Sequence, residues 1–257
     1  MLARGKTVRK ASPSRKPGAP QSALPVPVSA ARRKTDLDRK TVNQSNSMIQ
    51  SCYSLTLNEK RLLIMAGSEI KPGGPAAVRV NAKEFAKVFG IGSRGHAYEV
   101  LEDAAVRLYA RSIKSIEKTA SGMPVQERRW LTGRAMYENG SVLLEFNESI
   151  VQDMVLLTNA TSYPLKQISG LSSFYAIRLY EIIEAERKAH VSEPYLDLAR
   201  LRDMLDLGGK YPNVKDLRRW IIDPAMKEIS AKSDMNCEAE PVRKGRTVIG
   251  FKIVALG

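Results

Sequence analysis

The sequence predicts an α+β protein in which a basic tail precedes two similar folded halves. Three observations lead to this fold class. The first 40 residues are rich in proline and basic side chains and show no apolar period. Each half of the remaining chain carries helical patterns followed by the alternating pattern of a β-hairpin. The halves also share apolar positions at an almost constant spacing, which indicates an internal repeat. We therefore expect a disordered tail over 1–40 and domains over 41–160 and 161–257.

The composition favours a polyanionic partner. The 257 residues carry a formal net charge of +14, which favours nucleic acid first and an anionic membrane second. No apolar run reaches the ~18 residues that span a bilayer, so we expect no membrane partner. Residues 1–40 hold 11 of the 41 Lys and Arg. The tail is either an arm that raises non-specific DNA affinity or a solubilising segment, and its prolines argue against a secretory signal.

Cysteine and histidine usage predicts a cytoplasmic protein without a metal site or cofactor. Cys52 and Cys237 are far apart and form no CxxC pair, which argues against a disulfide or a zinc site. The two histidines, His96 and His190, are also far apart. The sequence contains no GxxxxGK[ST] phosphate-binding loop, so we expect no ATPase and no other enzyme activity.

The first half predicts a helix, a turn, a second helix and a hairpin. Thr56, with Glu59 three residues later, forms a capping box that begins a helix. Asn81 caps another helix, and Asn139-Gly140 is a strong hairpin signal. The further elements expected here are a strand over 78–80, helices over 82–89 and 94–112, a hairpin formed by 125–135 and 141–146, and a connection over 158–164.

The second half predicts the same order. Ser172 or Ser173 begins a helix and Asp197 caps the next one. Pro224 should kink the third helix or start a new one, because proline lacks a backbone donor. Trp220 and Ile221 of this third helix are expected in the core. The expected elements are a helix to about 188, a strand over 195–196, helices over 198–205 and 214–230, and a hairpin formed by 237–241 and 247–254.

The repeat is clearest over a strand, a helix and a turn. Five apolar positions of the first half correspond to five of the second at a constant offset of 116 residues. A helix, a turn, a second helix and a hairpin form the order of a winged helix, so the sequence predicts two winged helices in tandem. The matched positions are Val80, Phe85, Val88, Phe89 and Ile91 with Leu196, Leu201, Met204, Leu205 and Leu207.

The helix over 214–230 is the main candidate for reading DNA. It buries one apolar side and directs basic side chains outward near its start, as a major-groove reader does. An Arg there bonds guanine bidentately, whereas hairpin cations grip phosphates, which position the protein without specifying sequence. The alternatives are a solvated helix face, an Arg218 that turns back to a carboxylate of the protein, and an ordinary basic hairpin. The candidate DNA contacts are Lys210, Lys215, Arg218 and Arg219 near the helix start and Arg243, Lys244 and Arg246 in the hairpin.

The corresponding helix of the first half is a poorer candidate. It exposes Glu99, Glu102 and Asp103, and acidic groups that face phosphates reduce affinity. We expect this half to contact the DNA backbone instead. The candidate residues are Arg94 and, in the expected hairpin, Arg128, Arg129 and Arg134.

Several segments carry a family resemblance by their order and spacing. They are LTLNEKRLL at 55–63, FAKVFGI at 85–91, SSFYAIRLYE at 172–181 and LRDMLDL at 201–207, followed by Asp223-Pro224-Ala225 and Lys244-Gly245-Arg246. Over about 45–257 the chain resembles the iteron-binding replication initiators of theta-replicating plasmids, the RepE type.

The resemblance implies two winged-helix domains that bind direct repeats, called iterons, at a plasmid origin. Members act as monomers on these repeats, open the adjacent AT-rich DNA and help to load the host initiator and helicase. Dimers, paired through the first domain, repress their own gene. The implied partners are therefore double-stranded DNA, a second copy of the chain, and the host replication initiator and helicase.

Other function classes differ in their target or their chemistry. A winged-helix transcription regulator shares the DNA chemistry but binds only a promoter operator. A nicking enzyme of the rolling-circle type needs clustered metal-binding histidines with a nucleophilic tyrosine, and the histidines here are not clustered. An RNA-binding module needs aromatic side chains interleaved with basic ones on its surface. Aromatic residues of all kinds make up only 6% of this chain.

Overall fold

The structure is a computed structural model that describes Leu37 and residues 40–92, 94–116, 122, 124–156, 158–191 and 193–256. Of Arg94 and Ile116 it describes the backbone alone. All these residues belong to one unit of the chain, Arg33–Gly257. Apart from Leu37 and Lys40, the predicted tail over 1–40 lies outside the described residues. No described helix has both the length and the apolar character that crossing a lipid bilayer requires.

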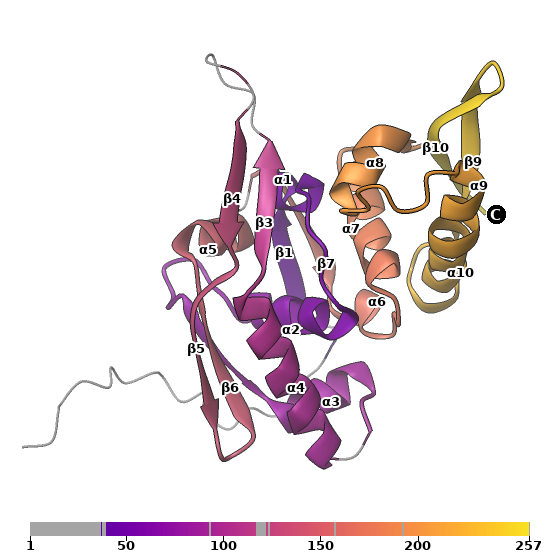
Figure 1. Cartoon of the computed structure of the whole chain (residues 1–257). Coiled ribbons are helices and arrows are strands. Elements are labelled where there is room, and N and C mark those ends of the chain that lie inside the picture. The colour runs from indigo at the N-terminus through magenta and orange to yellow at the C-terminus, as the bar shows by residue number, and fades with distance from the viewer. Residues whose placement is uncertain are drawn as a thin grey trace, which may run out of the picture. The chain divides into compact units, whose positions relative to one another are not determined.

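The first half contains the predicted helix, turn, helix and hairpin (Figure 1). Thr56 and Glu59 exchange side chain to backbone hydrogen bonds, so the predicted capping box is confirmed. Asn81 caps the next helix, which ends at Gly90 with a left-handed φ of 64°. The elements are β1 (Thr41–Ser45), α1 (Asn46–Gln50), α2 (Leu57–Gly67), β2 (Ala77–Asn81), α3 (Ala82–Phe89), α4 (Arg94–Tyr109), β3 (Ser112–Ile116), β4 (Val125–Arg129), β5 (Leu131–Tyr137), β6 (Ser141–Phe146), α5 (Glu148–Val155) and β7 (Ala160–Pro164).

The second half repeats the order of helix, strand, helix, turn, helix and hairpin. Ser173 caps its first long helix, and the predicted cap Asp197 accepts a hydrogen bond from the backbone of Arg200. The elements are α6 (Lys166–Ser169), α7 (Phe174–Lys188), β8 (Tyr195–Asp197), α8 (Leu198–Met204), α9 (Val214–Leu217), the π-helical turn η1 (Arg218–Ile222), α10 (Asp223–Lys232), β9 (Cys237–Lys244) and β10 (Thr247–Ala255).

The two halves have the same sheet topology. In each, the second strand of the hairpin lies in the centre of a three-stranded antiparallel sheet, with orders β2-β6-β5 and β8-β10-β9. The repeat positions Val80 and Leu196 pair with Val142 and Phe251 on these central strands, and all four side chains are buried. The internal repeat and the two tandem winged helices are therefore confirmed.

Three predictions about elements of the first half are wrong. The segment 125–135 is not one strand, because the chain bends at the fully buried Trp130. Only β5 pairs with β6, whereas β4 pairs with β3. The helix predicted to reach residue 112 ends at Tyr109, because β3 begins at Ser112. The segment expected to be a connection forms β7, which pairs with β1.

A buried polar network joins the two halves. The guanidinium of Arg178, on α7, donates hydrogen bonds to the carbonyl oxygens of Ile49 (2.8 Å) and Met204 (3.2 Å). Beside it, Glu181 forms a fully buried ion pair with Lys60 of α2 at 2.7 Å. Burial by itself would raise the pKa of the Glu181 carboxyl, but Lys60 and Arg178 hold this pKa below its ordinary value. The network therefore depends on complete pairing of its charges.

The contacts between the two halves, called the junction below, also reflect the internal repeat. Arg61 of α2 stands at the position equivalent to Arg178 of α7, and it donates a hydrogen bond to the carbonyl oxygen of Leu171 at 3.1 Å. Leu171 precedes α7, and Ile49, which accepts from Arg178, precedes α2. Each arginine thus binds backbone that leads into the other half's helix.

Candidate DNA-binding surface

The turn before α9 is held by a residue that sequence reasoning missed. Arg202 of α8 donates hydrogen bonds to the carbonyl oxygens of Lys210 (3.1 Å) and Tyr211 (2.6 Å). Tyr211 has a left-handed φ of 52°, a backbone conformation that residues other than glycine rarely adopt without such support. Asn213 then caps α9 by accepting a hydrogen bond from the backbone of Lys215 at 2.8 Å. Arg202 therefore holds the turn before the helix, and Asn213 caps its first turn.

The predicted break of the helix at Pro224 is confirmed: a π-helical turn ends just before it, and a new α-helix begins at Asp223. Proline has no backbone N–H, and the helix before it widens into the π-helical turn η1. There the N–H of Asp223 bonds to the carbonyl of Arg218, five residues back. The turn directs both Ile221 and Ile222 into the core. The predicted burial of Ile221 is confirmed, whereas that of Trp220 is wrong.

Trp220 instead lies on the outer side of the helix with 59% of its surface exposed. Two consecutive isoleucines occupy the interior at this turn, and no inward position remains for the indole. The guanidinium of Arg219 lies 4.9 Å from the centre of the indole ring, within cation–π distance.

The cations near the helix start differ in whether the protein neutralises them. Lys210, Lys215 and Arg219 are exposed, and their side chains have no carboxylate partner among the described residues. Arg218 does have a partner: its guanidinium forms an ion pair with Asp223 at 3.2 Å. Since this spacing of five residues fits the π turn, the alternative in which Arg218 turns back to the protein holds in this structure.

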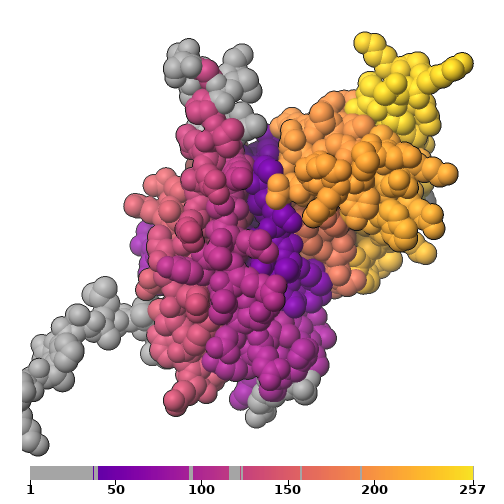
Figure 2. All heavy atoms as spheres, viewed as in Figure 1, coloured from indigo at the N-terminus to yellow at the C-terminus, as the bar shows by residue number. Residues whose placement is uncertain are grey.

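The hairpin of the second half presents a second group of cations. β9 and β10 are joined at Gly245, which has a φ of 61°, and Lys244 is paired with Thr247 across the turn. Figure 1 shows this yellow hairpin extending beyond α9, and Figure 2 shows its atoms projecting from the surface. The three candidate residues of the hairpin, Arg243, Lys244 and Arg246, are all exposed.

The corresponding helix of the first half has its cations paired. Arg107 forms an ion pair with Asp103 at 2.9 Å, and both side chains are on the outer face of α4. Arg111, just after α4, lies 3.5 Å from the buried carboxylate of Glu59. The side chain of Arg94 lies outside the described residues. The described part of this helix therefore offers DNA mainly cations that the protein has already neutralised.

The structure does not bring Arg128 and Arg129 into the β5–β6 hairpin, because both belong to β4. Arg128 forms an ion pair with Asp153 at 2.8 Å, and only 20% of its side chain is exposed. Arg129 is exposed and donates a hydrogen bond to the carbonyl of Tyr109 at 3.2 Å. Arg134 is on β5, 5.5 Å from the ring of Tyr109. Arg129 is thus the more available of the two β4 candidates.

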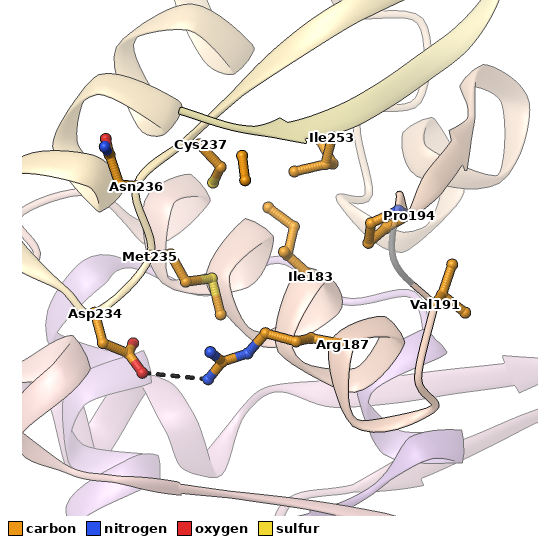
Figure 3. A pocket seen from close by; sticks show the side chains of 10 residues that line it. Ile183, Arg187, Val191, Pro194, Asp234, Met235, Asn236, Cys237 and Ile253 are labelled. Atoms are coloured by element: carbon orange, nitrogen blue, oxygen red, sulfur yellow. Dashed lines mark hydrogen bonds and ion pairs between the residues drawn. The ribbon is translucent and has the colours of Figure 1, made fainter. Parts of the chain in front are cut away.

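A cavity of about 210 Å³ lies at the base of the β9–β10 hairpin, against α7 (Figure 3). Cys237 and Ile253 line it, and Arg187 and Asp234 form an ion pair beside it at 3.2 Å. Burial raises the pKa of the Cys237 thiol, which favours the uncharged form. None of the predicted DNA contacts lines this cavity, so it is separate from the candidate surface.

Comparisons with known proteins agree with the duplicated fold. A family model described as "Initiator Replication protein, WH1" matches residues 41–184, and one described as "Initiator Rep protein, WH2" matches 197–254. A replication initiation protein of Escherichia coli is 25% identical over 214 residues, which cover 80% of this chain and 66% of that protein. The match thus spans just under two thirds of that relative.

Two further relatives extend this comparison. An uncharacterized 27.6 kDa protein of Escherichia coli is 25% identical over 210 residues, covering 76% of this chain and 86% of that protein. A crystal structure of the Pi initiator protein in complex with iteron DNA has a TM-score of 0.70 at 20% identity. This likeness covers 84% of this chain and 96% of that one, and at such identity it shows a common fold.

Proposed function

The chain belongs to the initiator replication protein family in both its WH1 and WH2 parts, and on that premise we propose that it binds direct repeats of duplex DNA at a plasmid origin. The observation that carries this proposal is the set of exposed cations on the helix and hairpin of the second half that have no carboxylate partner among the described residues. Such a set attracts the phosphate backbone and places arginine near base edges. The Pi initiator, which has the same fold, was crystallised with iteron DNA.

Within this function the second half, 161–257, is the main reader. Arg219 contacts a base edge in the major groove, and Lys210 and Lys215 accompany it at the helix start. Arg243, Lys244 and Arg246 hold phosphates from the hairpin. Arg218 contributes only if DNA displaces Asp223 from it.

The first half, 41–160, has a supporting role in this proposal. Arg94 and Arg129 contact the DNA backbone, and Arg128 adds a contact only if it leaves Asp153. The same half pairs two copies of the chain into a dimer that represses its own gene. Family membership supports this role and the further steps of origin opening and loading of the host initiator and helicase.

Footprinting of the full-length protein on the DNA that adjoins its gene tests the proposal. We expect regularly spaced protection over direct repeats, because a monomer with two winged helices covers one repeat at a time. Protection limited to a single promoter operator would favour the alternative, a winged-helix transcription regulator without a replication role. Affinity that falls about 10³–10⁵-fold between 50 and 200 mM salt would agree with 6–10 phosphate contacts.

A further inference from the structure

Trp220 is a feature of the candidate surface to which the proposed contacts assign no role. The residue is 59% exposed, whereas Trp130, the other tryptophan of the chain, is fully buried. Tryptophan has the largest apolar side chain and is mostly buried in folded proteins. Its exposure on the outer side of this helix, next to the exposed Arg219, therefore needs an explanation.

The neighbour of Trp220 supplies that explanation. The guanidinium of Arg219 lies 4.9 Å from the centre of the indole ring. Arg219 has no carboxylate partner in the described part of the chain, whereas the adjacent Arg218 is bound to Asp223 at 3.2 Å. Arg218 is thus directed along the helix toward Asp223, and Arg219 is directed onto an aromatic ring.

Arg219 and Trp220 both lie in the π-helical turn η1. Successive side chains of an α-helix diverge by about 100°, so neighbours do not normally lie together. Here the turn places Ile221 and Ile222 in the core, and Trp220 remains on the solvent side beside Arg219. The cation–π pair therefore lies in the π-helical turn that precedes Pro224.

Stacking leaves the hydrogen-bonding edge of a guanidinium free. The five N–H donors of arginine lie in the plane of the group, while an aromatic ring contacts its face. Guanine presents two acceptors, O6 and N7, in the major groove, and they match two parallel donors of arginine. An arginine that is already oriented loses less conformational freedom when it binds the base.

We propose that Trp220 is a positioning residue for Arg219, and that its ring holds the guanidinium so that Arg219 recognises a guanine in the major groove of duplex DNA. The inference rests on the proposed function and names the base that the helix discriminates. Trp220 acts through Arg219, so its loss should affect discrimination at one base pair more than affinity for DNA in general.

The test uses full-length protein and a duplex that this protein selects from a randomised library. Each guanine of the duplex is replaced in turn by 7-deazaguanine, which lacks the N7 acceptor. With the unmodified protein, one replacement should lower affinity about tenfold, as loss of a base contact does. In Trp220→Ala the same replacement should cost about twofold or less, and in Trp220→Phe most of the penalty should remain, because phenylalanine keeps an aromatic face.

Two controls separate positioning from a structural effect. Affinity of Trp220→Ala for a random duplex of equal length, and its salt dependence, should match the unmodified protein, because no phosphate contact is lost. In an Arg219→Ala background, adding Trp220→Ala should change the 7-deazaguanine penalty no further, as expected for two residues that act as a unit.

Three results would overturn the assignment. In the first, the 7-deazaguanine penalty stays at about tenfold in Trp220→Ala. In the second, Trp220→Ala weakens binding to the selected and random duplexes alike. In the third, the variant leaves DNA binding intact and changes only self-association, measured by sedimentation. If the unmodified protein selects no sequence from the library, the proposed function falls, and the role of Trp220 falls with it.

Discussion

The two winged-helix halves hold equivalent helices whose cations differ in availability. On α4, Arg107 is paired with Asp103 at 2.9 Å. On the helix of the second half, Lys215 and Arg219 are exposed and have no carboxylate partner among the described residues. Each helix follows a turn after a short helix and precedes the hairpin of its own three-stranded sheet, with β3 and β4 inserted between α4 and the β5–β6 hairpin. The difference teaches that a shared fold does not fix how much positive charge a helix leaves available at its surface; the ion pairs that each helix makes within the protein do.

The largest expected effect concerns the junction on which both halves depend. Lys60→Met should lower the free energy of unfolding by about 3–5 kcal/mol, because it leaves the buried Glu181 with an incomplete set of partners. Urea unfolding measures this change. Lys188→Met is the control: its lysine is exposed and 3.8 Å from Glu184, so it should cost less than about 1 kcal/mol. Equal losses in the two variants would show that the network does not hold the halves together.

Acid should weaken the same junction. Since the folded-state pKa of Glu181 is lowered, the carboxylate contributes stability above its unfolded pKa of about 4.3, and this contribution is lost as the pH falls through the folded-state value. The difference in unfolding free energy between the unmodified protein and Glu181→Gln should therefore be constant near neutral pH and shrink below about pH 4.3. A difference that grows on acidification would contradict the assigned direction of the shift.

Charge reversal compares the two helices directly. The double variant Lys215→Glu with Arg219→Glu should lower affinity for the selected duplex by about 10²–10³-fold, because it removes a base contact and places acids beside phosphates. Arg107→Glu should lower it by about threefold or less, since Asp103 already neutralises this arginine. Fluorescence anisotropy with a labelled duplex gives both values. Similar losses from the two helices would break the comparison.

The hairpin cations should act on all sequences alike. Lys244→Ala should weaken selected and random duplexes equally and reduce the slope of log affinity against log salt by about 1. Salt titrations on both duplexes measure this change. Arg128→Ala is the matched control. This variant should leave the slope unchanged, because the guanidinium of Arg128 is bound to Asp153 at 2.8 Å.

The smallest effect is a gain in the first half. Asp103→Asn should release Arg107 and raise affinity for a random duplex by about two- to threefold, because one acid is removed and one cation becomes free for phosphate. The salt slope should steepen at the same time. A loss of affinity would mean that the ion pair is needed to shape α4.

Local signals in the sequence were sufficient for much of the fold. The capping box at Thr56, the cap at Asp197 and the break at Pro224 each depend on residues within one helical turn, and all three are present. The repeat added the topology, because positions 116 residues apart had to occupy equivalent places in two strand–helix–turn units.

The errors arise where distant residues decide the structure. Strand β4 pairs with β3 because the buried Trp130 bends the chain, and no local pattern states which strand it joins. Trp220 was expected in the core, but the π-helical turn gives its inward place to Ile222. The ion pair between Arg218 and Asp223 was one of the predicted alternatives, and its spacing of five residues fits the same π-helical turn. Arg202, which holds the turn before α9, gave no signal in the sequence.

The ratio of affinities for the selected and random duplexes, measured for Arg219→Ala at one salt concentration, tests the central claim most directly. We predict that this ratio falls about tenfold while affinity for the random duplex changes by less than about twofold, because Arg219 reads a base and the remaining cations still hold the phosphates. An unchanged ratio, or an equal fall on both duplexes, would contradict the claim that the second half reads the sequence through this helix.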